Sequence, residues 1–353
     1  MLLSYHPRES TSGTNSEGST SGRAPLGSAR KRSMCRLISF VDEEFTSLHQ
    51  QRDHASIHGS NNFWGISMGL LYQKRDWEVV DYEGYFLLPH FYARGPRPLR
   101  LIPYQYFACI GAAQTFGCFC TQPYPALLQA KIGLPSLNLG RAGAGPHFFV
   151  NHLPLLQKVN EARFVIVQVM SGRSEDNSLF ESGGLEWLTR RSDGEQLGAE
   201  LAYRQLLDNY SPQYVNEVIA ETRANWIASY QRLLLEIKRP KVLFWFSQRG
   251  PRYTEALTSV HSLFGRFPQL VNAAMIESIK PFCDRYIECV SNRGMPQTLR
   301  SRFTGAPTVV DYARKNEAPR GSQINSYYPS PEMQADAAES LLGACRDLAG
   351  PLG

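Results

Sequence analysis

Glycines, short polar residues and arginines gather where apolar runs of this chain end. The segment Gly111-Ala112-Ala113-Gln114-Thr115 opens a helical stretch, and backbone N–H groups at such a start favour an anion or a carbonyl oxygen. Gly140 permits close backbone approach, and Arg141 and Arg173 bring fixed positive charge suited to phosphate, sulfate or carboxylate. The predicted ligand-binding set is Gly111, Ala112, Ala113, Gln114, Thr115, Gly140, Arg141, Gln168, Arg173 and Tyr328.

A nucleophile is harder to find in the same region. Cys118 follows the glycine loop, and His147 lies on the predicted helix after the second strand, so a Cys–His pair is one option. Such a pair needs a partly exposed, activated thiolate. Ser171 and Ser174 have no base nearby in the sequence. The chain has seven cysteines and no CxxC pair, so we expect free thiols, no metal site and no cofactor.

These residues must be positioned by alternating strands and helices. The apolar runs predict strands over residues 106–110, 136–140, 164–170, 241–247 and 286–290. The intervening patterns predict helices over residues 123–132, 147–159, 215–237, 269–279 and 331–348. Strand–helix alternation of this kind favours an α/β fold: a flavodoxin-like open parallel sheet of about five strands with helices on both faces. Its ligand site should lie beyond the carboxyl ends of the strands.

The chain divides into three predicted parts. Residues 1–35 are rich in Ser, Thr and Gly and should form a disordered tail, unless translation starts at Met34. Residues 36–105 should form an extension packing on the main domain, which covers 106–349. An insertion at about 175–212 should be a lid or binding loop, or else a solvated face that carries the pair Arg190-Arg191.

Charge and hydropathy exclude several partners. The formal net charge is +5, but residues 1–36 hold six basic and two acidic side chains, so the rest of the chain carries only +1. A nucleic-acid reader would carry a basic patch on its folded body, so we expect no nucleic-acid partner. No apolar run is long enough to cross a membrane, and the N-terminus lacks the order of a signal peptide. A cytoplasmic protein with a small-molecule ligand is predicted.

The order of the motifs resembles that of the SGNH/GDSL hydrolases over roughly residues 106–348. Gly111-Ala112-Ala113-Gln114-Thr115 resembles their GDSxT block, and Gly140 resembles the glycine of their second block, an oxyanion-hole donor. Gly172-Arg173-Ser174-Glu175 falls where their GxND block belongs, with Asn177 just beyond. Asn325 to Pro329 precedes the last helix, as DxxHP does in that family.

A more specific likeness, over residues 79–345, is to an uncharacterised alphaproteobacterial family that brings no known activity. The shared features are Asp81-Tyr82, Arg94-Gly95-Pro96, the loop glycines and threonine Gly111, Thr115 and Gly117, the Pro-Ala-Leu-Leu helix start at 125–128, and Tyr-Tyr-Pro-Ser-Pro-Glu-Met at 327–333.

The departures from the hydrolase pattern decide the predicted function. Ala113 stands at the nucleophile position, Tyr328 at the histidine and Asn325 at the aspartate, so the triad is degenerate. Loss of the serine or histidine alone costs about 10⁶-fold in turnover in a serine hydrolase. The first hypothesis is a non-hydrolytic protein that binds a small anionic or sugar-like ligand in the former active-site cleft. A transferase or hydrolase with relocated catalytic residues is the alternative, and a protein-interaction platform is the second.

Overall fold

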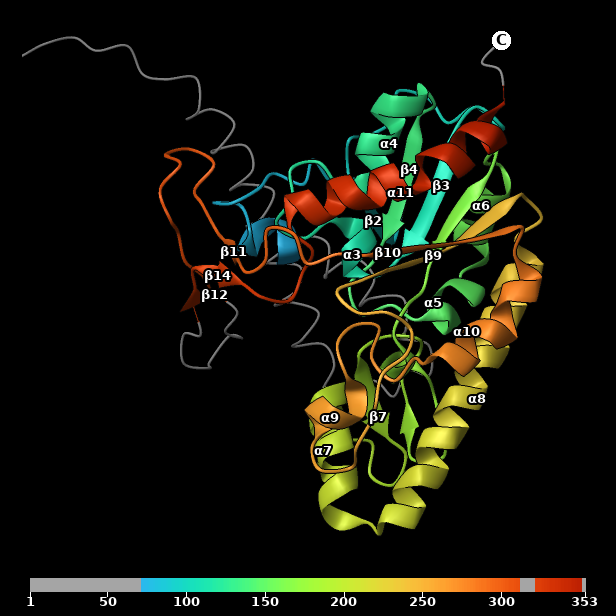
Figure 1. Ribbon diagram of the computed structural model, residues 1–353, viewed down its shortest axis with the longest axis vertical. Helices are drawn as coiled ribbons and strands as arrows, with labels where there is room; N and C mark the ends of the chain where they lie inside the picture. The colour runs from blue at the N-terminus through green and yellow to red at the C-terminus, as the bar shows by residue number, and fades with distance from the viewer. Residues whose placement is uncertain (1–70, 312–320, 351–353) are drawn as a thin grey trace, which may run out of the picture. The chain divides into compact units, whose positions relative to one another are not determined.

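Five parallel strands form the central sheet, in the order β10-β9-β5-β3-β4 (Figure 1). They are β3 (Phe107–Gly111), β4 (Ser136–Gly140), β5 (Val165–Gln168), β9 (Lys241–Ser247) and β10 (Arg285–Val290). Numbered along the chain, this is the 2-1-3-4-5 order of the flavodoxin-like fold, so the predicted fold class is confirmed. The computed structural model describes residues 71–311 and 321–350, which all belong to one unit.

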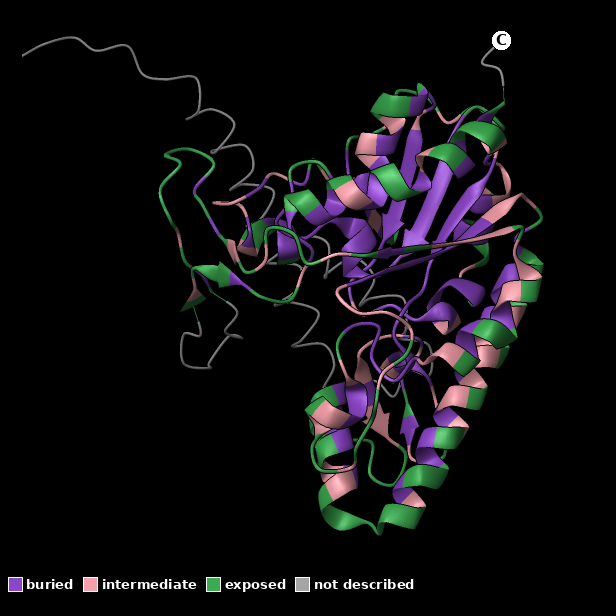
Figure 2. Ribbon diagram, viewed as in Figure 1, coloured by how far each residue is buried: buried purple, intermediate pink, exposed green. Residues whose placement is uncertain are grey.

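Helices cover both faces of this sheet, so β3, β4, β5 and nearly all of β9 are buried, whereas the edge strand β10 is partly exposed (Figure 2). On β9, Leu243 and Trp245 face one core, whereas Val242 and Phe244 face the other. The first core packs against α5 (Pro146–Val150), α6 (Leu153–Asn160), α8 (Pro212–Glu236) and α10 (Ala273–Ile279). The second packs against α4 (Tyr124–Ile132) and α11 (Pro331–Ala349).

Most expected elements lie where the sequence predicts them, and three differ. The helix expected over 269–279 begins at Ala273, because the side chain of Asn272 caps it, so Gln269 lies before the helix. The helix expected over 147–159 is two helices, α5 and α6, because the chain turns at Asn151-His152 before a proline in the first turn of α6. The strand expected over 164–170 is shorter, since β5 ends at Gln168. The side chain of that terminal glutamine is fully buried.

A separate small core lies beyond the carboxyl ends of the strands. It contains the antiparallel strands β6 (Phe180–Glu181), β7 (Trp187–Arg190) and β8 (Gln196–Gly198), followed by α7 (Ala199–Asn209). The start of α8 and α9 (Val260–Phe264) pack on these elements. The segment predicted as an insertion at about 175–212 thus has its own strands and a helix. Arg190 and Arg191 form ion pairs inside it, with Asp193, Glu195, Asp176 and Glu181.

Short antiparallel strand pairs precede and follow the sheet. Strands β1 (Tyr85–Leu88) and β2 (Phe91–Ala93) pair before β3. After β10, β11 (Gln297–Thr298) pairs with β14 (Ile324–Asn325), and β12 (Val310–Asp311) with β13 (Gly321–Ser322). The predicted tail at 1–35 and the part of the predicted extension before residue 71 lie outside the described residues. Within the described ranges, no helix is long and apolar enough to cross a bilayer.

Candidate functional site

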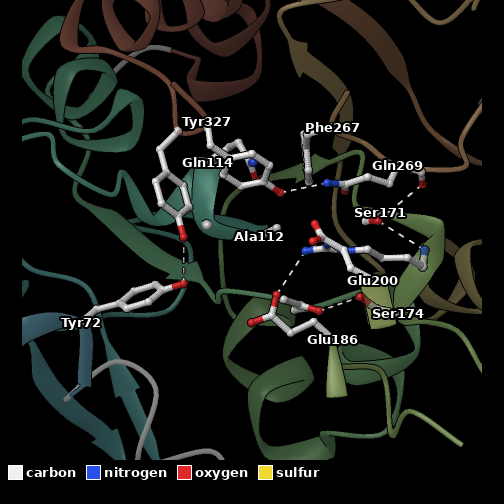
Figure 3. Close-up of a pocket in the computed structure, with 15 residues that line it drawn as sticks. Tyr72, Ala112, Gln114, Ser171, Ser174, Glu186, Glu200, Phe267, Gln269 and Tyr327 are labelled. Atoms are coloured by element: carbon white, nitrogen blue, oxygen red, sulfur yellow. Dashed lines mark hydrogen bonds and ion pairs between the residues drawn. The ribbon is translucent and has the colours of Figure 1, made fainter. Parts of the chain in front are cut away.

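A cavity of about 210 Å³ opens at the carboxyl edge of the sheet (Figure 3). Its walls come from the segments after β3, β4 and β5, from the inserted segment, from the stretch before α10 and from the turn before α11. The lining residues are Tyr72, Ala112, Ala113, Gln114, Gly143, Ala144, Ser171, Arg173, Ser174, Glu186, Glu200, Phe267, Gln269, Tyr327 and Tyr328. Strands β3 and β5 flank the point where the strand order reverses, which is where ligands bind in open α/β sheets.

Half of the predicted ligand-binding set lines this cavity: Ala112, Ala113, Gln114, Arg173 and Tyr328. The other five residues lie outside its lining, and the physical reasons differ. They are Gly111, Thr115, Gly140, Arg141 and Gln168.

Gln168 supports the turn between β3 and the four-residue helix α3 (Ala113–Phe116). Its Oε1 accepts hydrogen bonds from the backbone N–H groups of Ala112 (3.1 Å) and Thr115 (3.2 Å) and from the Thr115 hydroxyl. Both side chains are fully buried. The predicted role of Gln168 and Thr115 in ligand binding is therefore corrected, because they bond to each other. One of the backbone donors expected to hold an anion, the Thr115 N–H, is likewise already used.

Gly140 and Gly111 lie against protein atoms and not against the cavity. A Cβ on Gly140 would clash with the backbone N of Phe116 in α3, and one on Gly111 would clash with Thr115 Oγ1 and Gln168 Oε1. The close backbone approach predicted at Gly140 exists, but its partner is α3 and not a ligand oxygen. Glycine is needed at both positions for packing.

The two predicted arginines differ in position. Arg141 is buried, and its guanidinium carbon lies 4.8 Å from the centroid of the Phe148 ring. Burial lowers its pKa to about 10. It does not line the cavity, which corrects its predicted place in the site. Arg173 does line it, with Nη2 3.1 Å from Glu186 Oε2 and Nη1 3.5 Å from Glu200 Oε1.

The cavity lining therefore has an excess of negative charge. Its charged side chains are Arg173, Glu186 and Glu200, one cation against two carboxylates. The guanidinium of Arg173, expected to attract an anion, is already paired with these two carboxylates. Electrostatically the lining favours a neutral or donor-rich ligand over an anion.

Three buried polar atoms in this lining have no hydrogen-bond partner within the part of the chain that the structure describes. They are Gln114 Oε1, Gln269 Oε1 and Arg173 Nε. Gln114 is 2% exposed and Gln269 4% exposed, and the other end of the Gln269 amide donates to the Tyr327 hydroxyl (3.0 Å). A buried polar atom without a partner costs about 1–3 kcal/mol. Two free amide oxygens in one cavity are suited to a ligand that donates hydrogen bonds.

The degenerate triad positions hold no catalytic arrangement. Ala113 lines the cavity with a methyl group. Asn325 is buried and shapes the turn before α11, because its Oδ1 accepts from the backbone N–H of Tyr327 (3.1 Å) and Tyr328 (2.9 Å). The Tyr328 hydroxyl lies 3.3 Å from that of Tyr72, and burial raises the pKa of Tyr328 well above its ordinary value.

Relocated nucleophiles are disfavoured by the same geometry. Cys118 is fully buried beneath α3 and does not line the cavity, and burial raises the pKa of its thiol. His147 is held by Glu175, whose Oε2 lies 3.7 Å from Nδ1, and it does not line the cavity either. Burial lowers the pKa of His152, whose Nδ1 contacts the Phe148 carbonyl oxygen at 2.8 Å.

The two cavity serines contact backbone atoms. Ser174 Oγ donates to the Gly143 carbonyl (2.8 Å), and Ser171 Oγ contacts the Gln269 carbonyl (3.4 Å). Within the described residues, no histidine lines this cavity with them. The same residues hold no cluster of three or more His, Cys, Asp or Glu side chains suited to a metal ion.

Several lining residues could not be selected from the sequence. Glu186 and Glu200 belong to the segment predicted as an insertion, where the length of the segment was the only signal. Gln269 and Phe267 lie between α9 and α10, in a stretch that Arg249 holds through the carbonyls of Arg266 (2.9 Å) and Pro268 (2.6 Å). Tyr327 also lines the cavity. The sequence predicts its neighbour Tyr328 for the site but not Tyr327 itself.

The fold and the site thus define a flavodoxin-like α/β protein with a polar cavity at the switch point of its sheet. The chain belongs to the family defined by a domain of unknown function, DUF6473, whose model matches residues 74–182 and 204–348. Residues 183–203, which include Glu186 and Glu200, fall between the two matched ranges. The predicted resemblance to an uncharacterised family is confirmed.

Solved structures similar to this chain include a lipase, a putative SGNH hydrolase and an acetylxylan esterase. The lipase Lip_vut3 from a goat rumen metagenome is 10% identical, covering 68% of this chain and 96% of that one, with a TM-score of 0.36. A putative SGNH hydrolase from Slackia heliotrinireducens is 13% identical over 69% and 99% of the two chains, with a TM-score of 0.32. A catalytic mutant of the acetylxylan esterase Axe2 from Geobacillus stearothermophilus is 13% identical over 70% and 94%, with a TM-score of 0.32. No curated protein matches the sequence.

Proposed function

We propose that this protein binds a small, neutral, hydroxyl-rich ligand of the sugar class in the cavity between Gln114, Arg173 and Gln269, without hydrolysing it. The observation that carries the proposal is the set of buried polar atoms in one lining, Gln114 Oε1, Gln269 Oε1 and Arg173 Nε, that have no partner among the described residues. Ligand hydroxyls donate to amide oxygens and carboxylates and accept from Nε, so they match this mixture.

Charge selects between the two ligand classes that the sequence predicts. An anion entering the cavity would meet Glu186 and Glu200, and the guanidinium of Arg173 is engaged by both. Like charges brought together in a confined site oppose binding. A sugar hydroxyl, in contrast, gains from a carboxylate because hydrogen bonds to charged acceptors are the stronger ones.

The absence of hydrolysis in the proposal rests on side-chain chemistry. Ala113 has no nucleophilic atom, and the raised pKa of the Tyr328 phenol makes it a poor base near neutral pH. The cavity serines hydrogen-bond or contact backbone carbonyls.

A thermal-shift panel tests the proposal. The neutral arm holds glucose, galactose, mannose, xylose, N-acetylglucosamine and myo-inositol, and the anion arm holds sulfate and acetate. We expect at least one neutral member to raise the Tm in proportion to the logarithm of its concentration above its Kd, and by more than either anion does. A ligand at 100 times its Kd stabilises the native state by about 2.7 kcal/mol.

Matched variants separate site binding from the general stabilisation that sugars exert as excluded solutes. Gln114→Leu and Gln269→Leu should abolish the logarithmic rise, whereas Gln213→Leu, on the exposed face of α8, should keep it. If the rise is linear in sugar concentration and equal in all four proteins, the cavity is not a sugar site.

A further inference from the structure

A second cavity, of about 410 Å³, adjoins the first and differs from it in charge. The two share five lining residues: Gln114, Glu200, Phe267, Gln269 and Tyr327. The two cavities are therefore neighbours, separated by no more than these shared side chains. Figure 3 labels Phe267, Gln269 and Tyr327 among the residues that line the first cavity.

The basic groups of the second cavity come from two elements. Arg204 lies one turn beyond Glu200 on α7, and Arg266 and His261 come from α9 and the segment after it. Arg266 Nη1 donates a hydrogen bond to Gln248 Oε1, a neutral amide oxygen, at 2.8 Å. In the part of the chain that the structure describes, neither Arg204 nor Arg266 has a carboxylate within ion-pair distance, in contrast to Arg173.

The segment that carries Arg266 is held firmly in place. Arg249 donates to the carbonyls of Arg266 (2.9 Å), Pro268 (2.6 Å) and Val271 (2.8 Å), and Arg223 Nε donates to that of Leu270 (3.0 Å). Apolar side chains, Phe246, Phe264 and Met333, are buried in the lining of the same cavity, whereas Arg204 and Arg266 are exposed. Cations beside low-dielectric walls attract an anion more strongly than cations on an open surface.

We infer that the ligand has two unlike ends: a hydroxyl-rich ring in the first cavity and a phosphate group bound by Arg204 and Arg266 in the second. The ligand class is thus a sugar phosphate. This inference rests on the proposed function and adds the anionic group that the first cavity by itself disfavours. Arginine suits the role because its guanidinium binds phosphate oxygens in a bidentate manner.

Calorimetric titration compares each hexose (glucose, galactose, mannose and N-acetylglucosamine) with its own 1-phosphate and 6-phosphate. We expect at least one ester to bind about tenfold or more tightly than its parent sugar, the gain of a hydrogen bond to a charged group. Raising the ionic strength should shrink this advantage and leave the parent sugar unchanged.

The double variant Arg204→Gln, Arg266→Gln should remove the advantage and keep the affinity for the parent sugar. Arg252→Gln is the matched control, because Arg252 is exposed, lies in the same loop region and lines neither cavity. If parent sugars bind but no ester binds more tightly, or if the advantage survives in the double variant, the sugar-phosphate inference is wrong and the proposed function stands. If neither sugars nor esters bind, the proposed function itself fails.

Discussion

At the scale of single residues, the polar side chains near this cavity divide into those that hold the protein together and those that face the ligand space. Gln168 belongs to the first group, since one amide oxygen serves the turn after β3 through three donors. Gln114 and Gln269 belong to the second, since their amide oxygens have no partner among the described residues. The same residue type thus has opposite roles within one site.

Replacement of Gln168 tests its structural role. Gln168→Leu leaves the N–H groups of Ala112 and Thr115 buried without an acceptor, and each such group costs about 1–3 kcal/mol. We expect the free energy of unfolding, measured with urea, to fall by roughly 2–4 kcal/mol. Gln213→Leu on exposed α8 should change it by no more than about 0.5 kcal/mol. A loss below about 1 kcal/mol in Gln168→Leu would show that the turn does not depend on this oxygen.

The pair of His147 and Glu175 predicts a dependence of stability on pH. The Glu175 carboxylate, 3.7 Å from His147 Nδ1, raises the pKa of His147, and burial raises the pKa of Glu175, so the folded protein holds these protons more tightly than the unfolded chain. The contribution of His147 is then fully present below pH ~6.5, its ordinary pKa, and is lost as the pH rises through its folded pKa.

We therefore expect the Tm to decline between about pH 6 and pH 8, and His147→Gln to flatten this decline. His152→Gln is the control, since burial lowers the pKa of His152 and its contribution has the opposite sign. A decline of unchanged slope in His147→Gln would contradict the assignment.

At the scale of elements, the site depends on how closely α3 approaches β4. Asn138 Nδ2 donates to the Thr115 carbonyl (2.9 Å), and Gly140 leaves no side chain between its strand and the backbone of Phe116. The cavity wall at Ala112–Gln114 is therefore fixed by the strand behind it.

Replacing each of two glycines by alanine separates the effect of close packing from the effect of helix propensity. Gly140→Ala places a methyl group against the α3 backbone, and overpacking of this kind costs about 1–3 kcal/mol. Gly343 is exposed on the solvent side of α11 and has open space where a Cβ would lie. Gly343→Ala should therefore raise stability by roughly 0.5–1 kcal/mol. Urea unfolding of both variants is the measurement. If Gly140→Ala is neutral, α3 does not pack on β4 as described.

Sequence patterns predict the elements well and the site partially, for a physical reason. Apolar runs bounded by Gly and Pro identify β4 and β9 with the same bounds that the structure gives. The apolar stretch at 147–159 is divided into α5 and α6 by a single turn at Asn151-His152, and the periodicity of apolar residues does not reveal so short an interruption. Gln168 and Gln114 look alike in the sequence, and only the direction of each side chain separates a turn support from a cavity wall.

At the scale of the whole molecule, the cavity combines segments distant in the sequence. Tyr72, Arg173 and Tyr327 lie far apart along the chain and line one space. Glu186 and Glu200 come from the inserted segment, whose strands and helix pack into their own core with α9. No local sequence pattern indicates that these segments meet. The two carboxylates give the cavity lining a net negative charge, whereas Arg173 by itself predicts a positive one.

Esterase assays test the absence of hydrolysis. We expect turnover of p-nitrophenyl acetate at the level of heat-treated protein, because loss of the serine or histidine costs about 10⁶-fold in a serine hydrolase. Ala113→Ser should not restore activity, since burial keeps the pKa of the Tyr328 phenol too high for it to act as a base. Robust turnover that Cys118→Ala or His147→Ala abolishes would instead support relocated catalytic residues.

The most direct test of the central claim is calorimetric titration of the best neutral sugar from the panel into wild-type protein, Gln269→Leu and Gln213→Leu. We expect one saturable site in wild-type protein, at least about tenfold weaker binding in Gln269→Leu, where a ligand hydroxyl loses its buried acceptor, and unchanged binding in Gln213→Leu. Equal affinity in all three proteins would contradict it, because the sugar would then bind outside the cavity.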